Sequence, residues 1–250
     1  MDDALFSTIS RLQSNRPWGR VLDAGTGAHS LAWIRTLDTT GWTAVTGDPA
    51  RERALLGSLG AVRRGADRVV TGNWTDPLLE QGEVYDTVLA DYLLGAVDGF
   101  APYFQDQLFA RLRRNVGGRL FVVGLEPYPD HTESDGGRLV LEIARLRDAC
   151  ILLAGHRCYR EYPRDWVERS LESAGYIVEE AVSIPIIYKS KFIDGQLDVC
   201  LRKLPHIHDP KLVAALRENI EELRHQAHLV CGITDGIQFG ADYVVAARPR

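Results

Sequence analysis

The sequence predicts an α/β fold: a doubly wound, mainly parallel seven-stranded sheet with a helical insertion between the last two strands. Short apolar runs with the length of buried strands alternate with segments of helical periodicity, which is typical of a parallel sheet covered on both faces. Four of the five strand ends in the first half carry an acidic side chain, and glycines stand in the loops between them. The chain has 250 residues, 45% of them hydrophobic, which suits a single domain over residues 1–250.

The first half of the chain supplies five strands and the helices between them. Pro49 favours the start of a helix, and Gly117 and Gly118 are expected to close the last helix of this half. The predicted elements are a helix at about 3–13, a strand at 20–24, a helix at 29–37, a strand at 42–48, a helix at 49–60, strands at 67–74 and 85–95, a helix at 103–115 and a strand from 119.

The second half departs from simple alternation. Helical patterns at 136–155 and 163–175 precede a strand at 176–188, in which Pro185 is expected to stop the pairing early. Helical spacing then continues over 189–239, before a last strand at 240–249 closes the chain. We expect the 189–239 segment to be a lid over an acceptor site, with a helical brace or a homodimer surface as alternatives.

Composition and charge argue against several classes of protein. The net charge of −5 and the absence of a basic block do not favour nucleic acid as a partner. The N-terminus is acidic rather than a secretory signal, and no apolar run reaches the length of a membrane span. Cysteines without a CxxC pair fit a reduced, cytoplasmic protein, and we expect no metal site. Those cysteines are Cys150, Cys158, Cys200 and Cys231.

The first glycine-rich loop, VLDAGTGAHSL at 21–31, indicates the kind of ligand. In the dinucleotide pattern GxGxxG the glycines would fall at Gly25, Gly27 and position 30, which is Ser30, so the third glycine is absent. Asp23 stands two residues before the first glycine, where it would repel a pyrophosphate and attract an ammonium or a sulfonium. The loop therefore favours an adenosine-bearing ligand that is positively charged at this end.

Two further strand ends suit the rest of such a ligand. Asp48, at the end of the second strand, can accept hydrogen bonds from both hydroxyls of a ribose. Asn73, after the third strand, can donate and accept, which suits the edge of an adenine. In parallel sheets these ends meet at one edge, so we expect the residues to lie together.

The ordered set of motifs resembles the class I S-adenosylmethionine-dependent methyltransferases, a Rossmann-like family. The resemblance covers roughly residues 18–188 and the last strand. It rests on VLDAGTG, on VTGD at the second strand, on TGNW after the third, on YDTVLADYLL at the fourth and on YPRDWVERSLESAGY. It implies S-adenosylmethionine as the cofactor.

The resemblance also implies a role for each cofactor-site residue. Gly25 and Gly27 would let the backbone approach the methionine portion, and Asp23 would hold its amino group, directly or through water. Asp48 would bind the ribose, and Trp74 would border the adenine.

Two residues depart from the family pattern. His29 stands where the family often has glycine, and Asn73 stands where it often has aspartate. We expect Asn73 to border the adenine nevertheless, and His29 to narrow the loop or to contact the ligand.

Methyl transfer needs alignment and a dry cavity, and a base only where the acceptor must lose a proton. By position in the family, Asp91 lies near the cofactor and could accept that proton or hold an acceptor amine, while Tyr92 would shape the wall. His131 is a further candidate for the general base. Residues after the fifth strand and at the start of the 189–239 segment could contact the substrate: Glu126, Tyr128, Tyr188 and Lys191.

The leading hypothesis is a methyltransferase acting on the oxygen or nitrogen of a small molecule. A protein or peptide methyltransferase is the first alternative, because the 189–239 segment could dock a chain instead. A non-catalytic regulatory protein that only binds the cofactor is the second, and a nicotinamide-dependent dehydrogenase is the third.

Overall fold

The computed structural model describes residues 4–59 and 64–250. Contacts between residues divide the chain into two compact units. The first unit holds 1–126, 159–184 and 242–250, and the second holds 127–158 and 185–241.

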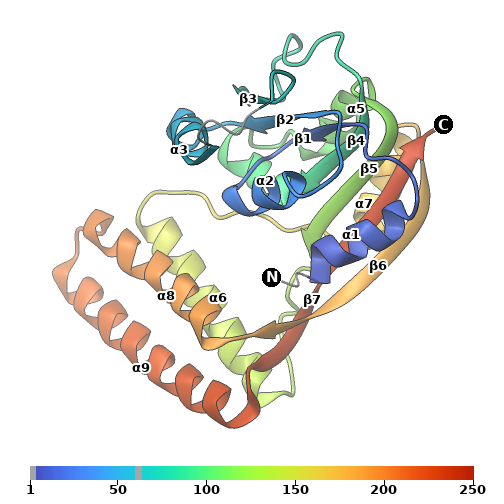
Figure 1. Ribbon diagram of the computed structural model, residues 1–250. Coiled ribbons are helices and arrows are strands. Elements are labelled where there is room, and N and C mark those ends of the chain that lie inside the picture. Colours follow the sequence, from blue (N-terminus) through green and yellow to red (C-terminus); the bar gives the residue numbers. More distant parts are fainter. Residues whose placement is uncertain (1–3, 60–63) are drawn as a thin grey trace. The chain divides into compact units, whose positions relative to one another are not determined.

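The first unit is built on a seven-stranded sheet in the order β3-β2-β1-β4-β5-β7-β6, which confirms the predicted number of strands (Figure 1). The strands are β1 (Arg20–Asp23), β2 (Gly41–Thr46), β3 (Arg68–Thr71), β4 (Tyr85–Asp91), β5 (Val116–Leu125), β6 (Tyr176–Tyr188) and β7 (Ile237–Pro249). Strands β1 to β5 pair with one another in parallel, whereas β7 pairs with β5 in the antiparallel direction. The sheet is therefore mixed, and the carboxyl ends of its parallel strands share one edge.

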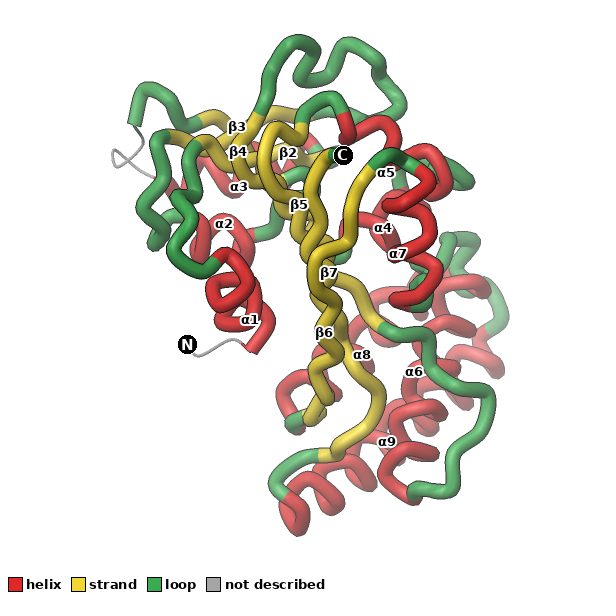
Figure 2. Tube along the Cα trace, turned by 90° about the vertical axis from the view of Figure 1, so that its right-hand side faces the viewer, coloured by secondary structure: helices red, strands yellow, loops and turns green. Residues whose placement is uncertain are grey.

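Helices cover both faces of this sheet (Figure 2). They are α1 (Ala4–Gln13), α2 (Ala28–Ile34), α3 (Pro49–Leu59), α4 (Leu93–Ala96), the 3₁₀ turn η1 (Val97–Gly99), α5 (Gln105–Arg113) and α7 (Arg164–Ser173). Side chains of α1, α2 and α3 pack on one face, and those of α4, α5 and α7 pack on the other. The doubly wound arrangement follows from the continuous apolar runs of the central strands.

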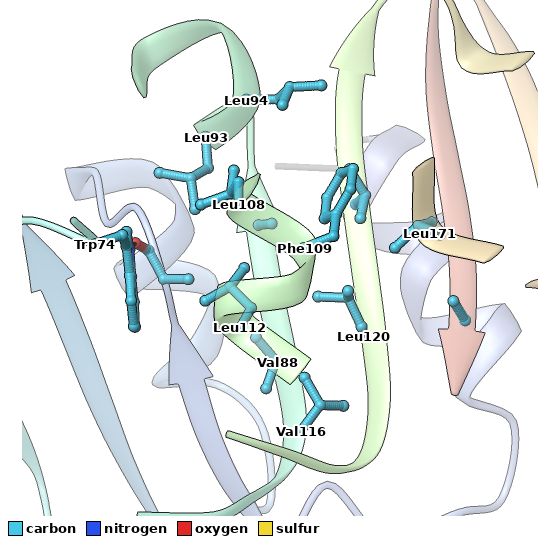
Figure 3. Packing of buried hydrophobic residues seen from close by; sticks show 14 of the residues in the cluster. Trp74, Val88, Leu93, Leu94, Leu108, Phe109, Leu112, Val116, Leu120 and Leu171 are labelled. Carbon is cyan, nitrogen blue, oxygen red and sulfur yellow. Dashed lines mark hydrogen bonds between the residues drawn. The ribbon is translucent and has the colours of Figure 1, made fainter. Parts of the chain in front are cut away.

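Alternate residues of the central strands point to opposite faces, and this builds two cores. Val88 and Leu120 pack under α5, where Leu108 and Leu112 meet them (Figure 3). Their chain neighbours on β4 and β5 enter the other core, below α1 and α2. Burial on both faces holds the sheet edge in place beneath the loops that follow each strand.

The structure corrects the role expected for Gly117 and Gly118. Helix α5 ends at Arg113, and the two glycines belong to β5. A Cβ on Gly118 would lie 2.3 Å from the backbone oxygen of Asp86, and one on Gly117 would lie 2.7 Å from Val84. The pair lets β5 approach the neighbouring strand closely, so it serves strand pairing and does not close the helix.

The last two strands also differ from the expectation. β6 continues through Pro185 to Tyr188, and it is an edge strand, where a missing backbone N–H costs no pairing. β7 begins at Ile237, three residues before the predicted start, so the last residues of the 189–239 segment are strand.

The second unit is a helical assembly of α6 (Asp135–Leu153), α8 (Ser190–Lys203), the 3₁₀ turn η2 (Leu204–His206) and α9 (Pro210–Thr234). Helices α8 and α9 follow one another between β6 and β7, within the predicted 189–239 segment. They share one core with α6, where Leu139 and Ile143 pack with Leu197 and Ile220. The unit thus extends beyond the predicted segment, because the apolar face of α6 is buried against the other two helices.

Candidate functional site

A cavity of about 320 Å³ opens in the first unit at the carboxyl ends of β1, β2 and β3. Four of the residues predicted for a cofactor line it: Gly25, Asp48, Asn73 and Trp74. The opposite wall is apolar and comes from the segment after β4 and from the segment before α7, with Leu93, Val97, Phe100, Phe104 and Tyr159. The predicted meeting of three strand ends is confirmed.

The glycine loop is held in a fixed path by backbone hydrogen bonds. The N–H of Ala24 donates to Leu89 at 2.8 Å, and that of Thr26 donates to Val45 at 2.8 Å. A Cβ on Gly25 would lie 2.8 Å from Cδ1 and 3.1 Å from Cβ of Leu93, so the loop passes close to the cavity wall and a larger residue would displace the Leu93 side chain. Gly27 precedes the first turn of α2 and is not part of the cavity lining.

Asp23 lies behind this loop rather than on the cavity wall. Its side chain is fully buried, and Oδ2 accepts a hydrogen bond from the Ser30 hydroxyl at 2.7 Å. Oδ1 is buried without a hydrogen-bond partner among the described residues. Burial raises the pKa of Asp23 to about 6, although the bond from Ser30 opposes the shift. Hydrogen bonds from the Thr26 side chain and the Gly25 backbone oppose the shift as well, so the carboxylate is a buried acidic group that the start of the glycine loop partly stabilises.

Replacing Asp23 by asparagine tests this burial through the pH dependence of stability. A folded-state pKa near 6, above the ordinary 3.8, means that ionisation opposes folding. As the pH rises from about 4 to about 6, the free energy of unfolding of the wild type should fall relative to that of Asp23→Asn, by roughly 3 kcal/mol in total. Urea denaturation of both proteins across that range measures the difference, and a difference that does not change with pH would contradict the account.

Asp48 sits at the start of α3 with its side chain half-buried. Its Oδ1 accepts a hydrogen bond from the backbone N–H of Ala50 at 2.8 Å, which caps the helix. One turn further on, Arg51 also lines the cavity. A guanidinium nitrogen of Arg51 lies 3.8 Å from where a Cβ of Gly27 would be. The cavity thus carries one carboxylate and one guanidinium near the glycine loop.

Asn73 joins two loops at the edge of the cavity. Its Nδ2 donates to the backbone oxygen of Phe100 at 2.8 Å. Its Oδ1 accepts from the backbone N–H and from the hydroxyl of Thr75, both at 3.0 Å. The Phe100 ring in turn lies against Gly47, where a Cβ would be 2.6 Å from the ring.

Trp74 ties the third strand end to the first. Its indole is buried, and Nε1 donates to the backbone oxygen of Ala24 at 2.6 Å. The guanidinium of Arg111 lies 5.1 Å from the centre of the Trp74 rings, and burial lowers the pKa of Arg111. Arg111 also donates to the backbone oxygen of Leu79 at 2.6 Å. These contacts hold the glycine loop and the β3 loop together.

Trp74→Phe should reduce the free energy of unfolding by about 1 to 2 kcal/mol, because the buried Ala24 oxygen loses its donor. Trp166→Phe in α7 is the matched control, since this half-buried ring packs on the same core. Urea denaturation of both variants gives the comparison. Equal losses in the two variants would show that only ring packing matters.

Asp91 and Tyr92 stand at the carboxyl end of β4. Tyr92 has a left-handed backbone, with φ of 46°, which is uncommon for a tyrosine and typical of constrained functional segments. Burial raises the pKa of the Tyr92 phenol, as do the charge of Asp242 and its hydrogen bond to the phenol, and the charges of Asp91 and Glu161 add to the shift. The phenol therefore keeps its proton at neutral pH. Neither Asp91 nor Tyr92 is among the residues that line the cavity, and their predicted roles stay predictions.

Several other predicted residues lie away from the cavity lining. Within the first unit, the His29 ring packs on Phe6, with ring centroids 5.0 Å apart. Glu126 accepts a hydrogen bond from the backbone N–H of Arg164 at 3.2 Å, at the start of α7. Neither residue is among those that line the cavity.

The remaining predicted residues belong to the second unit. The hydroxyls of Tyr128 and Tyr188 are hydrogen-bonded to each other. His131 is exposed and lines a separate cavity of about 390 Å³ with Arg138 and Arg145. Lys191 is exposed in the first turn of α8. Their predicted roles toward a substrate stay predictions.

Neither metal ligands nor membrane-spanning helices are found in the described part of the chain. Among residues 4–59 and 64–250, no group of three or more histidine, cysteine, aspartate or glutamate side chains is arranged to hold a metal ion. In α9, Nε2 of His228 lies 2.9 Å from Oδ1 of Asp194, to which Arg224 also forms a salt bridge. Over the same ranges, no helix combines the length and apolar character that crossing a bilayer requires.

Sequence reasoning missed Arg51, Phe100 and Tyr159. Arg51 could have been found, because it lies three residues after Asp48 at the start of a predicted helix. Phe100 and Tyr159 carry no such signal, because one stands in an irregular loop and the other comes from a distant segment. Only the folded chain places them on one cavity.

Comparisons with known proteins place the fold. No family model matches the chain, and no curated protein matches its sequence. Among solved structures, a candidate methyltransferase from Bacillus halodurans C-125 is similar at a TM-score of 0.62, with 14% identity over 99% of this chain and 100% of that one. The mycolic acid cyclopropane synthase CmaA1, crystallised with S-adenosylhomocysteine, has a TM-score of 0.54 and 17% identity, over 97% of this chain and 84% of that one.

A third neighbour is named for a different reaction. The [4+2]-cyclase SpnF is similar at a TM-score of 0.54, with 14% identity over 98% of this chain and 80% of that one. At these identities the likeness concerns the fold alone. The chain has the Rossmann-like fold of the class I S-adenosylmethionine-dependent methyltransferases.

Proposed function

We propose that the chain is an S-adenosylmethionine-dependent methyltransferase and that the cavity of the first unit binds its cofactor. The observation that carries the proposal is the convergence of Gly25, Asp48 and Trp74 on one cavity at the carboxyl ends of β1, β2 and β3. In parallel sheets this is where ligands bind. The neighbour CmaA1, with the same fold, was crystallised with the demethylated form of this cofactor.

The residues of the cavity fit such a cofactor chemically. Asp48 uses Oδ1 to cap α3, and its second carboxylate oxygen can accept from ribose hydroxyls. The buried carboxylate of Asp23, with Oδ1 unbonded among the described residues, gives the glycine loop a negative potential that favours a cation over a pyrophosphate. The apolar wall after β4 suits the faces of an adenine.

A bound cofactor supplies a methyl group that is already activated on a sulfonium. The protein then has to align the acceptor, exclude water and take a proton where the acceptor carries one. Asp91, at the end of β4 and two residues before the cavity-lining Leu93, is the proposed acceptor of that proton. Tyr92 holds its own proton, so it can donate a hydrogen bond or shape the wall.

We propose a small molecule as the acceptor, methylated on oxygen or nitrogen, and charge favours an amine. Three carboxylates raise the pKa of the Tyr92 phenol: Asp91, Glu161 and Asp242. The electrostatic potential beside the carboxyl end of β4 is therefore negative. Such a field attracts a protonated amine and repels a phosphate or carboxylate. A protein or peptide acceptor is the alternative, distinguished by transfer assays on separate pools.

The test is transfer of a radiolabelled methyl group from S-adenosylmethionine to fractionated metabolite and peptide pools. The proposal expects a labelled small molecule from a cationic fraction. Label in peptides would favour the first alternative. Tight cofactor binding with no labelled product from any pool would favour a non-catalytic protein, or a different reaction such as that for which SpnF is named.

The lid role of residues 189–239 stays a prediction, and so does the homodimer surface. Ile233 is 85% exposed, and Leu229, one turn earlier on α9, is 54% exposed. Under the lid proposal, Ile233→Lys should leave the sedimentation coefficient of the protein unchanged. A dimer in the wild type that dissociates in Ile233→Lys would show instead that this face joins two copies.

A further inference from the structure

We propose that the Phe100 ring stacks on the adenine of the cofactor, and we call this ring the aromatic strap. We also propose that Asn73 positions the strap and does not itself form a hydrogen bond to the adenine amino group. The proposal rests on the proposed cofactor and adds a specificity-determining ring and its support. It replaces the role that the sequence predicts for Asn73.

The position of the Phe100 ring carries the first part. Phe100 follows η1, on the β4 side of the cavity, yet its ring lies on Gly47 at the end of β2. A Cβ on Gly47 would be 2.6 Å from Cδ1 and 2.9 Å from Cε1 of the ring, so a larger residue at this position would displace the ring. Both residues line the cavity, and the Phe100 side chain is still 46% exposed. The ring therefore bridges two walls and keeps a surface free for a flat ligand.

The hydrogen bonds of Asn73 carry the second part. An amide oxygen has two lone pairs, and both are directed to Thr75, through its N–H and its hydroxyl at 3.0 Å each. The exocyclic amino group of adenine is a donor, and it would need that oxygen. Nδ2 meanwhile donates to the backbone oxygen of Phe100 at 2.8 Å. The Oδ1 of Asn73 is thus occupied by its own loop, and one N–H of Nδ2 is occupied by the backbone of the strap residue Phe100.

An aromatic ring is a suitable partner for a nucleobase. Stacking on a side chain recognises the π-face of a base and needs no hydrogen bond from the protein. The loops after β2, β3 and η1 meet through Gly47, Asn73 and Phe100, so the backbone of Phe100 is anchored and its ring rests on Gly47 before any ligand arrives. Such preorganisation lowers the ordering cost of binding.

The Asn73→Asp substitution separates the two roles. The carboxylate still accepts from Thr75, so the loop keeps its turn, but it cannot donate to the Phe100 oxygen and repels it. A residue that reads the adenine amino group would bind as well or better as a carboxylate. A residue that positions Phe100 would bind worse. The two roles therefore predict opposite directions for one change.

Isothermal titration with S-adenosylhomocysteine measures the effect on the wild type, Asn73→Asp, Phe100→Ala and the double variant. Phe100→Ala should weaken binding about 5- to 100-fold, the scale of one stacked base, and Asn73→Asp should weaken it about 5-fold. The double variant should bind no worse than Phe100→Ala, because Asn73 acts through the ring. Phe100→Tyr should restore most of the affinity.

Controls keep the outcomes apart. Phe192→Ala removes a similarly exposed phenylalanine from the second unit and should leave the affinity unchanged. The melting temperature of unliganded Phe100→Ala should stay close to that of the wild type, since Phe100 is half-exposed. Equal or tighter binding by Asn73→Asp, or additive losses in the double variant, would overturn the proposal. A wild type that does not bind S-adenosylhomocysteine would instead refute the proposed function.

Discussion

Asp91→Asn should lower the turnover number for methyl transfer by about 10²- to 10⁴-fold while leaving the affinity for S-adenosylhomocysteine within about 3-fold of the wild type. The carboxylate stands at the end of β4, immediately before Tyr92, whose phenol is protonated at neutral pH. Asparagine keeps the size of the side chain and loses its capacity to take a proton or to pair with an ammonium. Steady-state kinetics on the acceptor found by the labelling assay, together with calorimetry, give the two quantities.

The matched control lies on the same strand. Asp86 is near the amino end of β4, and its Oδ2 accepts a hydrogen bond from the backbone N–H of Arg20 at 2.7 Å. Asp86→Asn keeps an acceptor there and should leave turnover and affinity unchanged. Equal losses of turnover and affinity in Asp91→Asn would place Asp91 on the cofactor, and no loss would remove it from the site.

Asp48→Ala should weaken cofactor binding by about 1 to 3 kcal/mol, the scale of hydrogen bonds to a charged group. The variant also loses the cap on α3, where Oδ1 now accepts from Ala50 at 2.8 Å. Its free energy of unfolding should therefore fall by about 1 kcal/mol. Calorimetry with S-adenosylhomocysteine and urea denaturation separate the two effects.

Asp48→Asn distinguishes binding from capping. The asparagine oxygen can still cap α3, so stability should match that of the wild type, while the loss of charge should still weaken binding. If Asp48→Asn and Asp48→Ala both bind with wild-type affinity, then the carboxylate serves the helix alone and the ribose role is wrong.

The parts of the fold that follow from local pattern could be predicted. Apolar runs that end in Asp23, Asp91 and Glu126 predicted the strands and their common edge. A buried strand and its end can be predicted from a few consecutive residues, because both produce a local pattern of apolar and polar side chains. The sheet order and the antiparallel β7 depend on which strands meet, and they have no comparable local signal. Gly117 and Gly118 illustrate this. Glycines are typical both of a helix end and of a close approach between strands, and only the tertiary structure distinguishes the two.

The candidate site divides in the same way. Gly25, Asp48 and Trp74 could be placed because each follows a strand at the expected spacing. The burial of Asp23, the hydrogen bonds of Asn73 and the ring of Phe100 depend on loops packed from separate elements, so the sequence could not assign them. The second unit extends beyond residues 189–239 for a similar reason, since the partners of Leu139 and Ile143 lie far along the chain.

The most direct test of the account titrates the wild-type protein with S-adenosylhomocysteine and, in parallel, with NADH. Acidic strand ends and a two-glycine loop should admit the adenosyl thioether and reject the dinucleotide diphosphate. The account predicts saturable heat with the first ligand and none with the second. Saturable binding of NADH, with no response to S-adenosylhomocysteine, would contradict it.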